Sequence, residues 1–388
     1  MKIIIAPDSF KESMSAKQAA QAIERGFRRV YPDADYFCFP IADGGEGTVD
    51  ALISANNGQR VEIQVTGPLN KPVDAYYGIL HKGTLAVIEM AAASGLMLVP
   101  AAQRNPLVTT SFGTGELIKH ALSLGVQQII LCVGGSATVD GGMGMMQALG
   151  IKFYDAEHNQ LGLGGQYLQL IDYIDDSQLD PRLKKIQIQL ACDVNNPLVG
   201  PQGAANIFGP QKGASPAMVD QLEQGMNNFA DVIEKITGVD YRAYPGGGAA
   251  GGLAMAAIAF MNALVTSGIE LVMQASGLAT ALANADLVIV GEGSMDGQSV
   301  AGKAPIGVAL EAKKYAIPVI ALSGMLGDDI EGLSQHGIDV ALSILPRLSS
   351  LPNALIAGEI NLEYAAQQVA QLLRLGSMLG GATKVLMD

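Results

Sequence analysis

Apolar, strand-like runs alternate with helical segments along this chain, and this alternation limits its fold more than any other feature. Four such runs occupy residues 2–6, 128–133, 286–290 and 318–322, and polar or glycine-rich residues follow each of them. Continuous apolar runs are typical of strands that are buried on both faces of a parallel sheet. A helix expected over 15–30 follows the first strand. The sequence therefore predicts an α/β protein with a doubly wound parallel sheet covered by helices.

The middle of the chain has a different pattern. Short strand-like runs between residues 60 and 90 are separated by turn residues, which is typical of a meander. A length of 388 residues also exceeds the size at which a single core usually suffices. We therefore expect one discontinuous domain formed by 1–75 and 275–388, and a second α/β domain with a mixed sheet inserted over 76–274.

Charge and cysteine usage exclude several classes of partner. The chain has 24 basic and 37 acidic residues, and its net charge of -13 repels nucleic acid and anionic membranes at long range. Cys38, Cys132 and Cys192 lie singly in apolar runs without C-x-x-C spacing, which indicates buried thiols in a reducing compartment. The apolar start ends at Pro7 and is too short for a signal peptide. We expect a cytoplasmic protein that binds neither nucleic acid nor membrane; whether it forms a homo-oligomer stays open.

Charged residues and glycines gather where the expected strands end, which is where parallel sheets bind ligands. Asp8 and Lys11 follow the first strand, and Asp43 and Glu46 flank two glycines in ADGGEGT. Carboxylates at such positions suit Mg²⁺, and a lysine near a helix start suits phosphate. An N-cap at Asp8 and a tight turn at Asp43 explain the same local patterns without a ligand, so both interpretations stay open.

Two later loops add candidate groups. GGSATVDGG directly follows the strand over 128–133 and offers hydroxyl and amide donors that suit phosphate, although a tight strand-to-helix turn has the same composition. In ACDVNNPL, Asp193 follows an alternating strand and precedes Asn195. A carboxylate there can accept a proton from a substrate hydroxyl, hold a metal, or only cap a turn. Lys212 lies in a further glycine-containing loop, FGPQKGA.

The segment GQSVAGKAP resembles the phosphate-binding loop of nucleotide hydrolases, but Ala304 replaces the hydroxyl that should follow Lys303. The amide cradle and the lysine charge remain, whereas one metal ligand is lost. Other enzyme classes fit poorly. None of the four strand-like runs is directly followed by G-x-G-x-x-G, no G-x-S-x-G is present, and the four histidines lie outside the dense loops. Phosphoryl transfer remains, because it needs positioning, carboxylates for Mg²⁺, cations and one base.

The ordered motifs resemble those of the bacterial type I glycerate kinases, from Lys2 nearly to the C-terminus. They are PDSFKES, ADGGEGT, SFGTGEL, GGSATVDGG, ACDVNNPL, FGPQKGA, GGGAAGG and GEGSMDGQSVAGKAP. The resemblance implies ATP- and Mg²⁺-dependent phosphorylation of D-glycerate, for most bacterial members to 2-phosphoglycerate. It also implies a flavodoxin-like domain formed by both ends of the chain, an inserted α/β domain, and an active site in the cleft between these domains.

The resemblance further implies roles for individual residues. Asp193 would be the general base for the glycerate hydroxyl, and the other catalytic groups would be Asp8 and Lys11. Substrate contacts would come from Ser9, Asp43, Glu46 and Asn195. Nucleotide and phosphate contacts would come from Gly134, Gly135, Ser136, Lys212, Gly291, Gly302 and Lys303. The metal would be held by Glu292 and Asp296.

Two positions depart from the pattern of the family. Val139 stands where many relatives have Asn, and Ser294 stands where an arginine often follows GEG. If that arginine binds phosphate in relatives, another cation must replace it here, and Lys212 is one candidate. Two alternative functions also stay open: a kinase of another small hydroxy or sugar acid, and a non-catalytic two-lobed protein that binds an organic acid. The many carboxylates at strand ends argue against a binder of anions.

Overall fold

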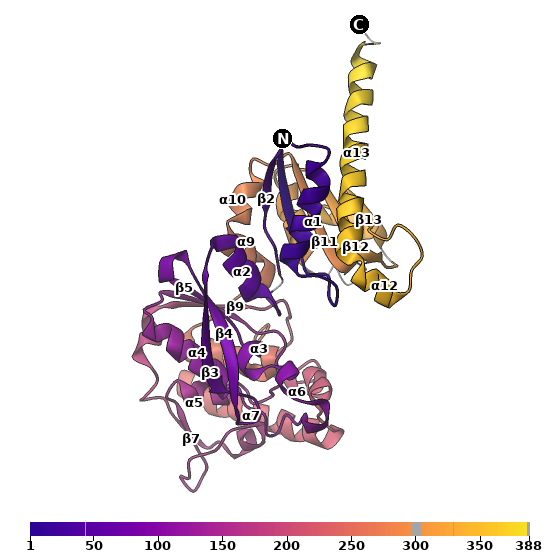
Figure 1. Ribbon diagram of the computed structural model, residues 1–388. Helices are drawn as coiled ribbons and strands as arrows, with labels where there is room; N and C mark the ends of the chain where they lie inside the picture. The colour runs from indigo at the N-terminus through magenta and orange to yellow at the C-terminus, as the bar shows by residue number, and fades with distance from the viewer. Residues whose placement is uncertain (43, 296–303, 329, 386–388) are drawn as a thin grey trace. The chain divides into compact units, whose positions relative to one another are not determined.

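Two compact units make up the chain, for which we describe a computed structural model (Figure 1). The structure describes residues 1–388 except 43, 296–303, 329 and 386–388. The first unit comprises Met1–Asp43 and Val272–Asp388, and the second comprises Gly44–Leu271.

A fully parallel sheet forms the centre of the first unit. Its strands lie in the order β2 (Asp35–Cys38), β1 (Lys2–Pro7), β11 (Leu287–Met295), β12 (Val319–Leu326) and β13 (Val340–Ser343). Counted along the chain within this unit, the spatial order is 2-1-3-4-5, which is the flavodoxin-like order. The predicted fold class is confirmed. The strand order reverses between β1 and β11, and ligands of such sheets bind beyond the carboxyl ends of the strands at this reversal.

Helix α1 (Ala16–Arg28) packs beside the C-terminal helix α13 (Gly358–Val385), as Figure 1 shows. Ser15 begins α1 with a capping box, and the buried face of the helix ends at Phe27. A Cβ on Gly26 would lie 2.4 Å from a backbone oxygen of α13, so only glycine permits this close approach. The other helices in the second part of this unit are α10 (Leu278–Leu282), α11 (Ala304–Lys313) and α12 (Leu351–Ile356).

A mixed sheet forms the centre of the second unit. Its strands lie in the order β10 (Leu264–Thr266), β9 (Gln187–Ala191), β6 (Gln128–Cys132), β5 (Leu85–Glu89), β4 (Pro72–Leu80) and β3 (Gln59–Thr66). The first four run parallel, whereas β3, β4 and β5 form the expected antiparallel meander. The unit begins at Gly44 rather than at residue 76, because β3 and β4 pair with β5 and belong to its sheet. Residue 76 lies inside β4.

Helices cover this mixed sheet, and a short ladder of β7 (Lys152–Tyr154) and β8 (Tyr173–Asp175) lies apart from it. The helices are α2 (Thr48–Asn56), α3 (Ala91–Ser94), α4 (Phe112–Ser123), α5 (Met143–Ala148), α6 (Ala204–Phe208), α7 (Pro216–Thr237) and α8 (Leu253–Met261), followed by α9 (Gly268–Ser276), which contains the boundary between the units. Cys132 and Cys192 are buried, as predicted, and Cys38 is partly buried. Within the described part of the chain, no helix combines the length and the apolar character needed to cross a membrane.

Candidate active site

Asp8 and Ser9 follow the end of β1, beside Glu292 of β11, at the order reversal of the first unit. Pro7 is in register with Gly291, and the Asp8 backbone N–H donates to the Gly291 carbonyl at 2.8 Å. The Oδ1 atom of Asp8 accepts a hydrogen bond from the Ser9 N–H at 2.6 Å. Glu292 is only 6% exposed. The parallel register of two buried strands therefore brings together residues that are far apart in the sequence.

Lys11 belongs to the same loop after β1. A Cβ on Gly293 would come within 3.4 Å of both the Lys11 nitrogen and the Phe10 Cα, so the loop packs closely on the end of β11. Phe10 is buried and anchors the loop, whereas Lys11 is exposed. The first unit thus carries an accessible cation in the loop that also carries Asp8.

Four predicted site residues, Asp43, Asp296, Gly302 and Lys303, lie outside the described residues. Their roles stay predictions.

The oxygen donors of the first unit fit Mg²⁺. This ion usually takes one or two protein carboxylates and completes its octahedral shell with phosphate oxygens and water. Asp8 follows the end of β1, and Glu292 lies in β11 directly after Gly291, the register partner of Pro7, so these two residues supply such a pair. No group of three or more metal-binding side chains occurs in the described residues, so a protein-only metal cage is not formed by them.

Asp193 lies at the carboxyl end of β9 in the second unit and is exposed. Its Oδ1 atom accepts hydrogen bonds from the Ser267 hydroxyl and from the Gly268 N–H, both at 2.9 Å. These donors follow β10, which pairs in parallel with β9. Two hydrogen bonds from a neighbouring strand end fix the orientation of this carboxylate while it stays accessible to a ligand.

The loop with Glu46 reaches the same strand ends. Gly44 has φ +85°, and a Cβ there would lie 2.8 Å from the Ala191 Cβ and 3.1 Å from the Gly268 Cα. A Cβ on Gly134 would lie 3.2 Å from the next residue of this loop, Gly45. Glycine is therefore required for close packing, and the exposed Glu46 belongs to a loop that contacts the ends of β6 and β9.

Glu89, which the sequence analysis did not single out, anchors this loop. It is 6% exposed at the end of β5, and its Oε1 atom accepts the Val49 N–H at 2.8 Å. It also accepts a hydrogen bond from the Gly47 backbone, so it caps the start of α2. Burial raises the pKa of Glu89 to about 7, although the two backbone donors oppose this shift.

The glycine-rich loop after β6 is organised by Asp140, which is fully buried. Its Oδ2 atom accepts hydrogen bonds from the Ser111 N–H at 2.8 Å and from the Ser111 hydroxyl at 2.9 Å. The N–H groups of Gly142 and Gly144 also donate to this carboxylate. Burial raises the pKa of Asp140, and its hydrogen bonds oppose that effect. Gly134 and Gly135 are exposed at the tip of the loop.

Lys212 is hydrogen-bonded to the same glycine-rich loop. Lys212 is 2% exposed, and its ammonium donates to the Ser136 hydroxyl and the Thr138 carbonyl, both at 2.7 Å. Burial lowers the pKa of Lys212 to about 7, and Asp140 opposes this effect. These hydrogen bonds show that Lys212 stabilises the conformation of the loop. A phosphate contact by Lys212 stays a prediction.

Two other motifs have packing roles in this structure. In SFGTGEL, a Cβ on Gly113 would lie 2.0 Å from the Thr66 oxygen, and one on Gly115 would lie 2.3 Å from the Met145 oxygen. In GGGAAGG, a Cβ on Gly251 would lie 2.0 Å from the Thr138 oxygen. These glycines allow elements of the second unit to pack closely.

The remaining predicted positions differ in accessibility. Asn195 is exposed two residues after Asp193. Val139 is fully buried in the core of the second unit, so a side chain at this position packs against apolar neighbours. Ser294 lies in β11, in register with Met325. The two departures from the family pattern therefore lie in different places: Val139 in the core of the second unit and Ser294 in a strand of the first.

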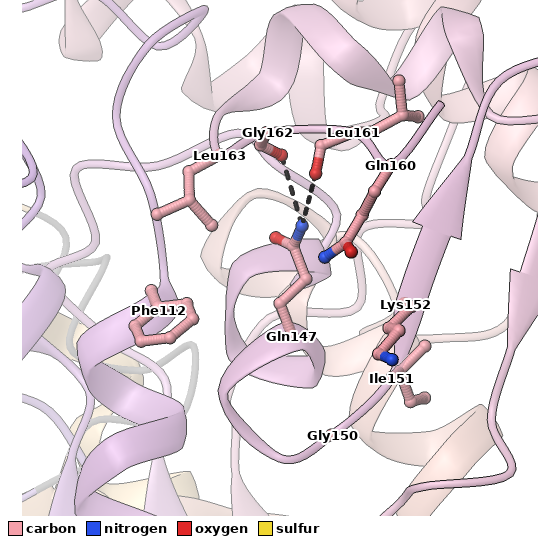
Figure 2. Close-up of a pocket in the computed structure, with 9 residues that line it drawn as sticks. All are labelled: Phe112, Gln147, Gly150, Ile151, Lys152, Gln160, Leu161, Gly162 and Leu163. Carbon is pink, nitrogen blue, oxygen red and sulfur yellow. Dashed lines mark hydrogen bonds between the residues drawn. The ribbon is translucent and has the colours of Figure 1, made fainter. Parts of the chain in front are cut away.

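A hollow of about 320 Å³ lies elsewhere in the second unit, beside the start of α4 and the end of α5. Figure 2 shows the Gln147 amide turned toward the chain at Leu161 and Gly162, whose carbonyls accept its hydrogen bonds at 3.1 and 3.3 Å. Phe112 and Lys152 also contribute to the lining. None of the predicted site residues lines this hollow, so the strand-end loops remain the candidate active site.

Known proteins resemble this chain over nearly its full length. Residues 3–374 match the model of the glycerate kinase family. The chain is 53% identical over 381 residues to glycerate 2-kinase of Escherichia coli (strain K12), which covers 98% of this chain and 100% of that protein. It is 50% identical over 379 residues to glycerate kinase of Bacillus subtilis (strain 168), which covers 98% and 99% of the two chains.

A solved structure extends the likeness to the fold. The crystal structure assigned to glycerate kinase 2 from Salmonella typhimurium LT2 superposes with a TM-score of 0.90 at 50% sequence identity, over 97% of this chain and 99% of that chain. The similarity thus includes both units and the strand-end loops.

Proposed function

The chain belongs to the glycerate kinase family, and we propose that it transfers the γ-phosphoryl group of ATP to the 2-hydroxyl of D-glycerate. Members of this family are phosphotransferases, and this chain is one of them. The proposed 2-position follows the name of the Escherichia coli relative, glycerate 2-kinase.

The placement of Asp193 is the observation that carries the proposal. A kinase acting on an alcohol needs a base within reach of the hydroxyl proton, and the base must be held in position before the phosphate arrives. Asp193 is accessible, and the hydrogen bonds from Ser267 and Gly268 hold one of its oxygens. Asn195, exposed nearby in the chain, is proposed to orient the substrate.

The proposed reaction is an in-line displacement. Asp193 takes the proton of the 2-hydroxyl as that oxygen forms a bond to the γ-phosphorus of ATP. The bond between this phosphorus and the β–γ bridging oxygen breaks, and ADP leaves with the electron pair. The protein's contribution is positioning and stabilisation of charge on the transferring oxygens.

We propose that the first unit supplies the groups that neutralise this charge. Lys11 supplies a cation, and Asp8 and Glu292 are the residues that would hold Mg²⁺. When bound, Mg²⁺ offsets negative charge on the phosphate oxygens. Ser9, Gly134, Gly135 and Ser136 are proposed to contribute hydrogen bonds to the substrate or phosphates. Asp43, Glu46, Gly291, Asp296, Gly302 and Lys303 keep the roles that the resemblance implies.

The decisive experiment combines ADP release with identification of the product. The full-length protein is incubated with Mg-ATP and D-glycerate, ADP is followed in a coupled assay, and the product is assigned by ³¹P and ¹³C NMR. We expect 2-phosphoglycerate. Formation of 3-phosphoglycerate would correct the position, and turnover only with another hydroxy or sugar acid would correct the substrate. Tight glycerate binding without ADP release would identify a binding protein instead of a kinase.

A further inference from the structure

Arg104 differs from the other arginines of the described chain in its surroundings. Six arginines lie within ion-pair distance of a carboxylate: Arg25, Arg28, Arg29, Arg60, Arg182 and Arg242. Within the described residues, Arg104 has neither a carboxylate partner nor a side-chain hydrogen bond. Arg347 and Arg374 are exposed to water, whereas Arg104 is partly buried. Arg104 is thus a partly buried arginine with no carboxylate partner among the described residues.

The Nε atom of Arg104 makes this setting more specific. It is buried and has no hydrogen-bond acceptor among the described residues. A guanidinium stays protonated at any physiological pH, so this N–H is always a donor. A buried donor without an acceptor is unfavourable, and the preferred acceptor of a guanidinium is a planar or tetrahedral oxyanion that can take two parallel hydrogen bonds.

The chain leading to Arg104 runs along the glycine-rich loop. Gly95 and Ser136 form an isolated antiparallel bridge, and the Leu96 N–H donates to the Gly135 carbonyl at 2.8 Å. A short 3₁₀ helix, Ala101–Gln103, then ends directly before Arg104. The arginine therefore follows a segment that is hydrogen-bonded to a loop predicted to bind phosphate.

Arg104 also contacts the loop that carries Lys212. A Cβ on Gly213, which has φ +92°, would lie 2.4 Å from the Arg104 oxygen and 2.8 Å from the Arg104 Cβ. The neighbouring Lys212 already donates to Ser136 and Thr138. Lys212 therefore already has hydrogen-bond partners within the protein, whereas the neighbouring Arg104 has no described partner for its guanidinium.

We propose that Arg104 is an anion-binding residue that takes an oxyanion of a ligand, either a phosphate of the nucleotide or the carboxylate of glycerate. That the ligand is ATP or glycerate rests on the proposed function. That the ligand is an anion rests on the buried Nε of Arg104, which is unpaired among the described residues.

The test uses the full-length protein and isothermal titration calorimetry with ADP, pyrophosphate and D-glycerate. Arg104→Met should raise the Kd of at least one ligand by about 10-fold or more, since it removes a charged, two-pronged hydrogen-bond donor. Weaker binding of ADP and pyrophosphate identifies the phosphate as the anion, and weaker binding of D-glycerate alone identifies the carboxylate. The matched control is Arg182→Met, which removes an arginine that is paired with Asp180, and it should leave all three affinities unchanged.

A folded Arg104→Met protein with wild-type affinity for all three ligands would overturn the proposal. If circular dichroism shows that this variant does not fold, the wild-type protein is labelled with phenylglyoxal and the modified peptides are quantified. Ligand should slow the modification of Arg104 by about 10-fold relative to the exposed Arg60; equal rates with and without every ligand would also overturn the proposal. Absence of kinase activity would refute the proposed function alone, because the binding and protection measurements need no turnover.

Discussion

The loops after β6 and β9 start from neighbouring strands of the same sheet, yet their aspartates have opposite surroundings. Asp140 is fully buried, and its carboxylate accepts hydrogen bonds from Ser111 and from the backbone of its own loop. Asp193 is exposed, and one of its oxygens is held by Ser267 and Gly268. Both residues belong to polar, strand-ending motifs that look equally functional in the sequence.

The difference in burial indicates a structural role for Asp140 and a chemical role for Asp193. The hydrogen bonds of a buried carboxylate to protein donors determine the shape of its loop, and no ligand is required to explain them. A carboxylate that is oriented but accessible can exchange a proton with a substrate. We therefore expect substitutions at Asp140 to act on stability and those at Asp193 to act on turnover.

Asp140→Ala should have the largest effect. It leaves the buried donors of Ser111, Gly142 and Gly144 without their acceptor, and the unfolding free energy should fall by about 3 kcal/mol. Urea unfolding followed by circular dichroism measures this change. Asp155→Ala is the control, because Asp155 accepts similar hydrogen bonds in a solvent-exposed turn and its loss should lower stability far less. Equal losses in the two variants would contradict the structural role of Asp140.

Asp193→Asn should lower kcat by about 100-fold or more, which corresponds to roughly 2.7 kcal/mol in the activation barrier. The KM for glycerate should change less, because the amide keeps the size of the carboxylate and loses only its basicity. Steady-state kinetics and a thermal unfolding curve check both parts. A wild-type rate, or a loss of stability that accounts for the loss of activity, would make Asp193 structural and remove its contrast with Asp140.

Much of this architecture follows from the sequence. Buried apolar runs such as 286–290 predict parallel strands, and the observed β11 begins within that run. The polar residues at the ends of these runs are brought together in each unit because parallel strands share a carboxyl edge. The start of the second unit does not follow from the sequence, because the residues of β3 and β4 are compatible with either sheet and only their pairing with β5 assigns them to the second unit.

Burial and side-chain direction could not be obtained in this way. Glu89 ends a buried strand and carries no motif, and its role as an anchor appears only when α2 is placed beside β5. Ser267 is similarly inconspicuous in the sequence. The motif around Lys212 predicts a phosphate contact, which stays a prediction, but it does not reveal that the ammonium donates to Ser136 and Thr138. A sequence motif gives the position of a charge along the chain and not the direction in which its side chain points.

Glu89 extends the comparison to a third strand-end carboxyl, with an effect that depends on pH. Its folded pKa of about 7 lies above its ordinary value, so folding favours the protonated form. The resulting stabilisation is complete below the pKa of the unfolded chain and is lost as the pH rises through about 7. Relative to Glu89→Gln, the unfolding free energy of the wild type should fall by on the order of 2 kcal/mol between pH 5 and pH 8. Urea unfolding of both proteins at each pH measures this change. A free-energy difference between wild type and Glu89→Gln that is independent of pH would show that burial does not raise the pKa of Glu89.

Ser267→Ala should give the smallest effect and the sharpest test of how Asp193 is held. It removes one of the two described hydrogen bonds to Oδ1 and leaves the one from Gly268, so kcat should fall by about 5-fold, near 1 kcal/mol. Ser123→Ala, which removes a hydroxyl bonded only to the backbone of α4, is the matched control and should keep the wild-type rate. If Ser267 acts only through Asp193, the same substitution in an Asp193→Asn background should change kcat little further. Fully additive losses would mean that the hydroxyl contacts the substrate directly.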